Sequence, residues 1–160
     1  MIKNITLLTA AHEHKPIIEN LMQFYMYDFS NYVDLDVEAD GLFKAYKDLA
    51  LYWNDKNRFP YIIQTQNTYA GFALVRWIET PQQSHYSIAE FFVMNKYRRA
   101  GIGKTIANQL FNLHKGNWEV FQKETNKPAQ LFWHSVIDTY TKGNFTERLK
   151  DGKRIQAFKT

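Results

Sequence analysis

The 160-residue sequence has no cysteine, no long hydrophobic run and no low-complexity tract. The lack of cysteine excludes disulfides, thiolate metal ligands and cysteine nucleophiles. No apolar run approaches the ~20 residues of a membrane span, so we expect neither a transmembrane helix nor a signal peptide, and a cytoplasmic location. No repeat or linker-like change in composition divides the chain, which predicts one domain over residues 1–160.

Charge of one sign is also scarce, because the formal net charge is only +4. No basic stripe with interleaved aromatic residues is present, so we expect neither nucleic acid nor a membrane as a partner. No cluster of His, Asp or Glu has the spacing of metal ligands, and we therefore expect no metal. What the chain has in excess is aromatic residues, at 16%, which suggests an aromatic-lined core or groove.

The hydrophobic pattern predicts strands alternating with helices. Three consecutive β-rich runs form an antiparallel meander, and a helical crossover then leads to a parallel strand. Gly71, inside one run, indicates a bulge or a close backbone approach. These elements indicate an α/β fold of the α+β type, with a mixed, mostly antiparallel sheet of six or seven strands and about four helices. The predicted strands are 2–8, 61–64, 69–77, 88–94, 118–121, 145–150 and 154–159, and the predicted helices are 10–28, 42–53, 103–114 and 128–137.

A basic glycine turn, residues 98–104, joins the strand at 88–94 to the next helix. Its two glycines, Gly101 and Gly103, let the backbone approach an anion closely. The first amides of the helix point at the same place unpaired, and the helix dipole favours negative charge there. Arg98, Arg99 and Lys104 add positive charge, so the turn is suited to binding phosphate.

Spacing separates three kinds of phosphate-binding turn. A P-loop requires a glycine where Arg98 stands, and a dinucleotide fingerprint requires one where Ile106 stands. The pattern R-x-x-G-x-G fits, through Arg98, Gly101 and Gly103. With this motif the chain resembles the GCN5-related N-acetyltransferase (GNAT) family, whose pyrophosphate loop has the form Q/R-x-x-G-x-G/A. The segment 126–133, NKPAQLFW, is similar to the family's N-x-x-A-x-x-F-Y segment.

The resemblance implies a single-domain acyl-CoA N-acyltransferase fold that binds acetyl-CoA as co-substrate. The pyrophosphate would lie on the backbone amides of residues 99–104. The pantetheine arm would run along residues 91–93, where the amide of Phe91 or Val93 would polarise the thioester carbonyl. The implied coenzyme-binding residues are Phe91, Val93, Arg98, Arg99, Ala100, Gly101, Ile102, Gly103, Lys104 and Asn126.

Glu90 is the candidate general base, because it interrupts an apolar strand beside the expected thioester site. The alternative is a strand-edge glutamate or a salt-bridge partner. The sequence departs from the family at Trp133, where many members have a tyrosine that acts as the acid. An indole N–H is no useful proton donor, so Tyr140 or a water would replace it. The alternative for Tyr140 is an ordinary hydrogen-bonded tyrosine.

The resemblance therefore predicts an N-acetyltransferase that moves an acetyl group to a primary amine of a small molecule or peptide. Alternate acidic residues in the segment 34–40 suggest a cationic acceptor, although a solvated loop is the simpler interpretation. A rival hypothesis is a non-catalytic sensor of acyl-CoA on the same fold. The sequence leaves open the acceptor, the length of the acyl group and whether the protein is a monomer or a homodimer.

Overall fold

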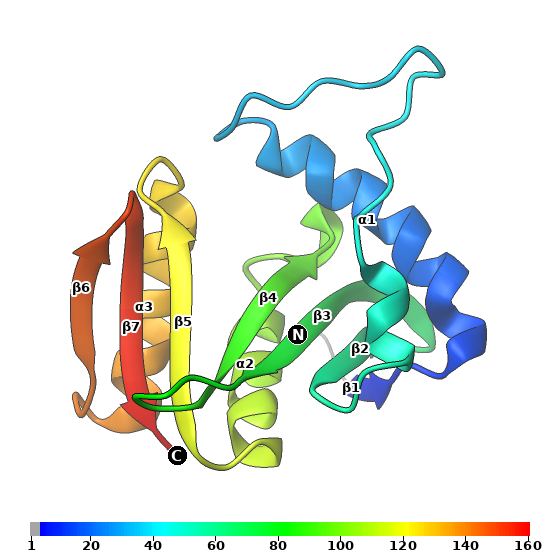
Figure 1. Cartoon of the computed structure of the whole chain (residues 1–160). Coiled ribbons are helices and arrows are strands. Elements are labelled where there is room, and N and C mark those ends of the chain that lie inside the picture. The colour runs from blue at the N-terminus through cyan, green and yellow to red at the C-terminus, as the bar shows by residue number, and fades with distance from the viewer. Residues whose placement is uncertain (1–3) are drawn as a thin grey trace. The chain divides into compact units, whose positions relative to one another are not determined.

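The computed structural model describes residues 4–160 and contains one seven-stranded, mostly antiparallel sheet with three α-helices among these residues (Figure 1). The strand order is β1-β2-β3-β4-β5-β7-β6, and β4 and β5 are parallel. This confirms the predicted fold class. No helix among these residues has the length and apolarity to cross a bilayer.

The elements are β1 (Ile5–Thr9), α1 (Lys15–Phe29), β2 (Arg58–Thr65), β3 (Thr68–Ile78), β4 (His85–Val93), α2 (Ile102–Leu113), β5 (Asn117–Lys123), α3 (Lys127–Thr141), β6 (Thr146–Lys150) and β7 (Lys153–Lys159). Short 3₁₀ turns lie at His12–His14 (η1), Leu49–Trp53 (η2) and Asn95–Tyr97 (η3).

The helix predicted over residues 42–53 is wrong. Only its end is helical, as the 3₁₀ turn η2, and residues 31–48 form neither helix nor strand. Asp48 has a φ of 65°, which interrupts a right-handed helix directly before Leu49. Leu42 is 54% exposed although Leu49 and Tyr52 are buried, so the apolar residues of this range do not form one continuous buried helical face. The predicted first strand was 2–8; it is observed from Ile5, and residues 2 and 3 lie outside the described part of the chain.

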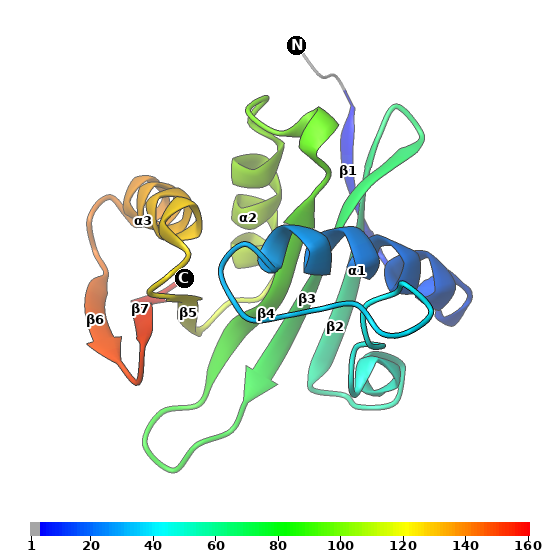
Figure 2. The same ribbon diagram turned by 90° about the horizontal axis from the view of Figure 1, so that it is seen from above.

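The chain divides into two compact units. One comprises the chain up to Leu74 together with Glu90–Ala100, and it contains α1, β1, β2 and the end of β4. Its helix α1 crosses β3 in Figure 2 and packs on that strand, where the ring of Tyr25 makes an edge-to-face contact with Phe72. The fully buried side chains of this unit include Ile18, Met22, Ile62, Ile63 and Phe72.

A close approach of two backbones shapes the end of β4 in this unit. A Cβ atom on Gly71 would lie 1.9 Å from the carbonyl oxygen of Phe92, a distance that no side chain tolerates. The amide of Met94 donates to the carbonyl of Ala70 beside it, at 2.8 Å. The interpretation of Gly71 as a close-approach position is therefore confirmed, because only a residue without a Cβ lets the backbone of β3 lie this close to that of β4.

The second unit comprises Val75–Ala89 and Gly101–Thr160, and it contains α2, α3 and strands β5, β7 and β6. Antiparallel pairing of β5 with β7 runs from Asn117 opposite Lys159 to Lys123 opposite Lys153. Helix α3 contacts both of these strands, beside which Figure 1 draws it. The core contains the fully buried side chains Ile106, Leu110, Phe111, Trp118 and Ile137.

Candidate active site

Glu90 lies on β4, and tyrosine hydroxyls donate to both of its carboxylate oxygens. The hydroxyl of Tyr25 bonds to Oε2, and the hydroxyl of Tyr46 bonds to Oε1 at 3.0 Å. All three side chains are half-buried. A carboxylate held at both oxygens by donors has a defined orientation, as a general base or a buried polar anchor requires.

Tyr25 is fixed by its helix and by aromatic packing. Its ring stacks on Phe29 of the same helix and meets the edges of Phe72 and Phe92, with centroids 5.7–6.0 Å apart. Burial, and then the negative charge of Glu90, raise the pKa of the Tyr25 phenol well above its ordinary value. The phenol therefore stays protonated and remains a hydrogen-bond donor to Glu90 at all working pH values.

Tyr46 comes from the irregular segment 31–48. Both polar ends of the Gln23 side chain hold this segment against α1: Oε1 accepts from the amide of Phe43 at 2.8 Å, and Nε2 donates to its carbonyl at 3.0 Å. Tyr25 and Tyr46 were not predicted as partners of Glu90. Their hydrogen bonds to it span 65 and 44 residues of sequence, and no local pattern signals such pairing.

Arg98, the first residue of the glycine-turn motif, is bound by protein atoms. Its Nε donates to the carbonyl of Val93 at 2.7 Å, its Nη2 pairs with Asp28 of α1, and its guanidinium lies 5.5 Å from the centre of the Phe92 ring. Asp28 and Tyr25 are three residues apart and lie on the same face of α1. Arg98 therefore fixes the point where the chain leaves β4.

The turn itself has the backbone of an anion site. Arg99 and Gly101 have φ values of 62° and 80°, and α2 begins at Ile102 with Gly101 as N-cap and no side chain capping it. Its first amides thus lack helical or capping acceptors, while the amide of Thr105 already bonds to the carbonyl of Gly101 at 3.0 Å. Open space surrounds the missing Cβ of Gly101. These features fit a bound pyrophosphate.

The remaining turn residues differ in exposure. Arg99, Ala100 and Lys104 are exposed, Gly103 is half-buried, and the side chain of Ile102 is buried in the core. Each can therefore contribute to the turn through its backbone, and Arg99 and Lys104 add exposed cations beside Arg98. On β4, Phe91 is half-buried and the Val93 side chain is buried. The coenzyme-binding roles of these residues stay predictions.

Asn126 is the N-cap of α3. Its Oδ1 accepts from the amide of Ala129 at 3.1 Å, and the amide of Gln130, one turn on, donates to its carbonyl at 3.2 Å. The side chain of Gln130 also donates to the carbonyls of Lys123 and Glu124 at 2.9 Å. The segment that resembles the family motif is thus a tightly bonded helix start. A role of Asn126 towards coenzyme stays a prediction.

Trp133, at the position of the family's tyrosine, and Tyr140, the candidate acid, are both engaged in contacts within their unit. Trp133 is only 6% exposed and packs in the core of its unit. The hydroxyl of Tyr140 donates to Oδ1 of Asn112 at 2.8 Å, close to the C-terminal end of α2. These contacts favour the interpretation of Tyr140 as an ordinary hydrogen-bonded tyrosine, with water left as the proton source.

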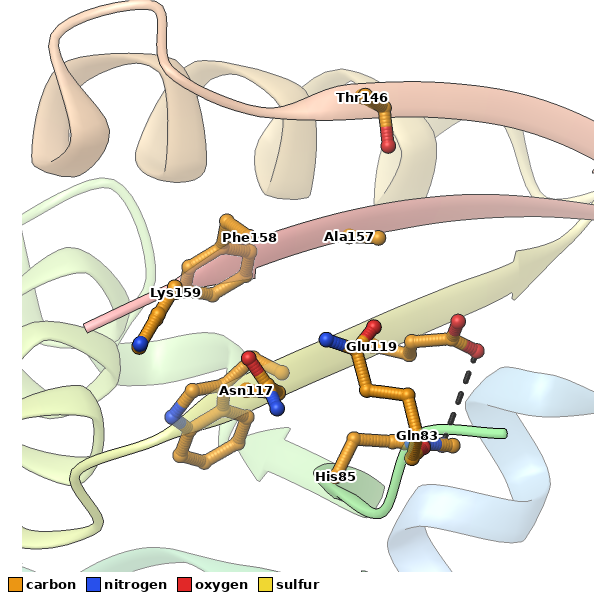
Figure 3. A pocket seen from close by; sticks show the side chains of 9 residues that line it. Gln83, His85, Asn117, Glu119, Thr146, Ala157, Phe158 and Lys159 are labelled. Atoms are coloured by element: carbon orange, nitrogen blue, oxygen red, sulfur yellow. Dashed lines mark hydrogen bonds and ion pairs between the residues drawn. The ribbon is translucent and has the colours of Figure 1, made fainter. Parts of the chain in front are cut away.

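A shallow hollow of about 330 Å³ lies elsewhere in the second unit, where β4 and β5 begin and β7 ends (Figure 3). Within it Nε2 of His85 lies 3.7 Å from Oε2 of Glu119, which also pairs with Arg148 at 2.9 Å. None of the sequence-predicted site residues lines this hollow. Among residues 4–160, no three or more His, Asp or Glu side chains gather in a group that could hold a metal ion.

The mixed sheet and the uncapped glycine turn are features expected of an acetyltransferase, and a family match agrees with them. The chain belongs to the acetyltransferase (GNAT) family, whose model matches residues 18–136. The resemblance inferred from the sequence is thereby confirmed. Membership in this family supports acetyl-CoA-dependent acetyl transfer.

Solved structures show the same fold at low sequence identity. An acetyltransferase from Thermus thermophilus superposes with a TM-score of 0.74 at 8% identity, over 99% of both chains. The PaiA N-acetyltransferase of Thermoplasma acidophilum, solved with coenzyme A, gives 0.68 at 12% identity, over 98% of this chain and 99% of that one. An aminoglycoside acetyltransferase from an uncultured soil metagenomic sample, solved with sisomicin, gives 0.60 at 17% identity, over 84% and 88%. No curated protein matches the sequence.

Proposed function

We propose that the protein transfers the acetyl group of acetyl-CoA to a primary amine by direct attack of the amine on the thioester, with Glu90 as general base. The observation that carries this proposal is the carboxylate of Glu90, oriented by two tyrosine donors on a strand that leads into the glycine turn. Family membership supplies the acetyl donor.

The reaction requires three proton movements. Glu90 takes a proton from the substrate ammonium, and the freed amine nitrogen then forms a bond to the acetyl carbon. As the carbon–sulfur bond breaks, the nitrogen loses its second proton to water, and the coenzyme leaves as a thiolate that takes a proton from water. The amides of residues 99–104 would hold the pyrophosphate, with Arg99 and Lys104 offsetting its charge. A backbone amide at residue 91 or residue 93 would stabilise the oxyanion.

The acceptor we propose is a cationic amine. Asp34, Asp36, Glu38 and Asp40 are all exposed on the segment 31–48, the same segment that delivers Tyr46 to Glu90. Four carboxylates close in sequence favour an ammonium over a neutral or acidic acceptor. Two of the similar structures are named for amine acetylation, the PaiA N-acetyltransferase and the aminoglycoside enzyme, which is consistent with this class.

The test is release of coenzyme A thiol by the purified protein with acetyl-CoA and a panel of amines: polyamines, amino acids, aminoglycosides and peptide N-termini. We expect turnover with a cationic member of the panel. Replacing Glu90 by Gln should lower kcat by about 10²- to 10⁴-fold with little change in affinity for acetyl-CoA. The exposed Glu13 offers a matched control, since Glu13→Gln should leave kcat unchanged.

Two outcomes would contradict the proposal. Unchanged turnover of the Glu90→Gln variant would remove Glu90 as the base. A protein that binds acetyl-CoA tightly but releases no thiol with any amine would instead be the acyl-CoA sensor, the rival class for this fold.

A further inference from the structure

The two tyrosines on Glu90 are held in different ways. Tyr25 lies in the C-terminal half of α1 and is packed among three aromatic rings, so its hydroxyl has a fixed position. Tyr46 lies in the segment 31–48, which has no helix or strand to hold it. Its hydroxyl reaches Oε1 of Glu90 only while this segment keeps its path.

Gln23 fixes that path near Tyr46. Its side-chain amide makes two hydrogen bonds to the backbone of Phe43, three residues before Tyr46. Gln23 lies on α1 and bonds to the segment rather than to Glu90. Substitution of Gln23 should therefore release the segment 31–48 from α1 without removing any contact of the Glu90 carboxylate.

We propose that Tyr46 is a positioning residue that makes the orientation of the Glu90 carboxylate depend on the conformation of the segment 31–48. This inference rests on the proposed role of Glu90 as the base. The segment also carries the exposed acidic residues from Asp34 to Asp40. An amine that binds these carboxylates and orders the segment would place Tyr46 on Glu90. The bound amine would thereby orient the carboxylate that removes its own proton.

The proposal predicts a specific pattern of kinetic effects. A hydrogen bond to a charged group contributes enough free energy to hold that group in one orientation. Loss of the hydrogen bond from Tyr46 to Glu90 should therefore lower kcat about tenfold. Tyr46→Phe should therefore reduce kcat about tenfold while the KM for acetyl-CoA stays within twofold. Gln23→Ala should reduce kcat by several fold, because it frees the segment.

The double variant separates positioning from general damage to the fold. If Gln23 acts through Tyr46, the Gln23→Ala/Tyr46→Phe protein should have the same kcat as Tyr46→Phe alone. Independent losses that multiply would overturn the proposal. Tyr69→Phe, which removes a phenol from an exposed position on β3, is the matched control and should leave kcat unchanged.

A second measurement does not depend on activity. In protein labelled with ¹³C at glutamate carboxyl carbons, the Glu90 signal is assigned by its loss in Glu90→Gln. Its chemical shift at pH 7 should move in Tyr46→Phe, and Gln23→Ala should move it in the wild-type background but not beside Tyr46→Phe. A Glu90 chemical shift that is unchanged by both substitutions would overturn the proposal. If no amine is acetylated by the wild-type protein, the proposed function fails, while this spectrum still decides whether Tyr46 positions the carboxylate.

Discussion

The guanidinium of Arg98 is held by protein atoms on two sides. One nitrogen donates to the carbonyl of Val93 and another pairs with Asp28. Since these side chains are 39% and 38% exposed, the ion pair contributes at most about 1 kcal/mol to stability. Its effect is geometric, because it fixes the start of the turn. A pyrophosphate on the turn would then be balanced by Arg99 and Lys104.

Tyr140 provides a test at the scale of one hydroxyl. Its partner Asn112 is ten residues beyond Ile102 on α2, which places it about 15 Å along the helix from the turn. We expect Tyr140→Phe to keep kcat within twofold and to lower the free energy of unfolding by about 1 kcal/mol, the net contribution of one hydrogen bond. Steady-state kinetics and urea unfolding measure the two effects. A tenfold loss of kcat would restore Tyr140 as the acid.

At the scale of elements, β4 and the turn after it were predictable from the sequence, and the segment 31–48 was not. The strand is a run of apolar residues interrupted by Glu90, and the turn has a motif with fixed spacing, so both are local signals. Gly71 could also be interpreted, since a glycine inside a strand has few explanations. The helix predicted over 42–53 failed because its apolar residues are held by contacts distant in sequence, such as that of Tyr46 with Glu90.

The residues of the candidate site also divide into those that the sequence predicted and those that it did not. Glu90 was identified because a charged residue in an apolar strand is unusual. The donors Tyr25 and Tyr46 fall in ranges that were predicted to be helical, 10–28 and 42–53. Sequence spacing cannot distinguish a packed ring from a ring whose hydroxyl has a distant partner. The contacts of Arg98 with Asp28 and of Tyr140 with Asn112 also join residues far apart in the chain. Tertiary pairing of this kind becomes visible only in the fold.

The edge strand β6 is attached to β7 and α3 through Glu147. Its carboxylate pairs with Arg154 at 2.8 Å and accepts from Gln156 at 2.9 Å, and Nδ1 of His134 lies 3.1 Å away. Burial disfavours the charge, but these hydrogen bonds outweigh it and lower the pKa of Glu147 below its ordinary value of 4.5. The ionised form is thus favoured by folding.

This lowered pKa predicts a loss of stability in acid. A carboxyl whose pKa is lower in the folded than in the unfolded state stabilises the fold above the unfolded value, and that contribution disappears as pH falls through the folded value. The free energy of unfolding should therefore be higher for the wild type than for Glu147→Gln at pH 7, and the difference should shrink below about pH 4.5. Urea unfolding between pH 3 and 7 measures it, with Glu13→Gln as control. A difference that is constant with pH would contradict the prediction.

At the scale of the whole molecule, two strands run through both compact units. In β3 the residues up to Leu74 belong to one unit and those from Val75 to the other, and in β4 the change falls between Ala89 and Glu90. A strand cannot lose the hydrogen bonds of one half without freeing the backbone of the other half at its junction. We therefore propose that residues 1–160 unfold as one cooperative domain.

Tryptophans in the two units make this proposal measurable in a single sample. Trp53 belongs to the first unit, where its indole donates to the carbonyl of Ala10, and Trp118 is buried in the second. In protein labelled with 5-fluorotryptophan, both ¹⁹F signals should lose intensity at the same urea concentration, because a cooperative domain has one transition. Trp53→Phe and Trp118→Phe assign the signals. Separate midpoints, with Trp53 changing while Trp118 keeps its native signal or the reverse, would show two independently folding domains.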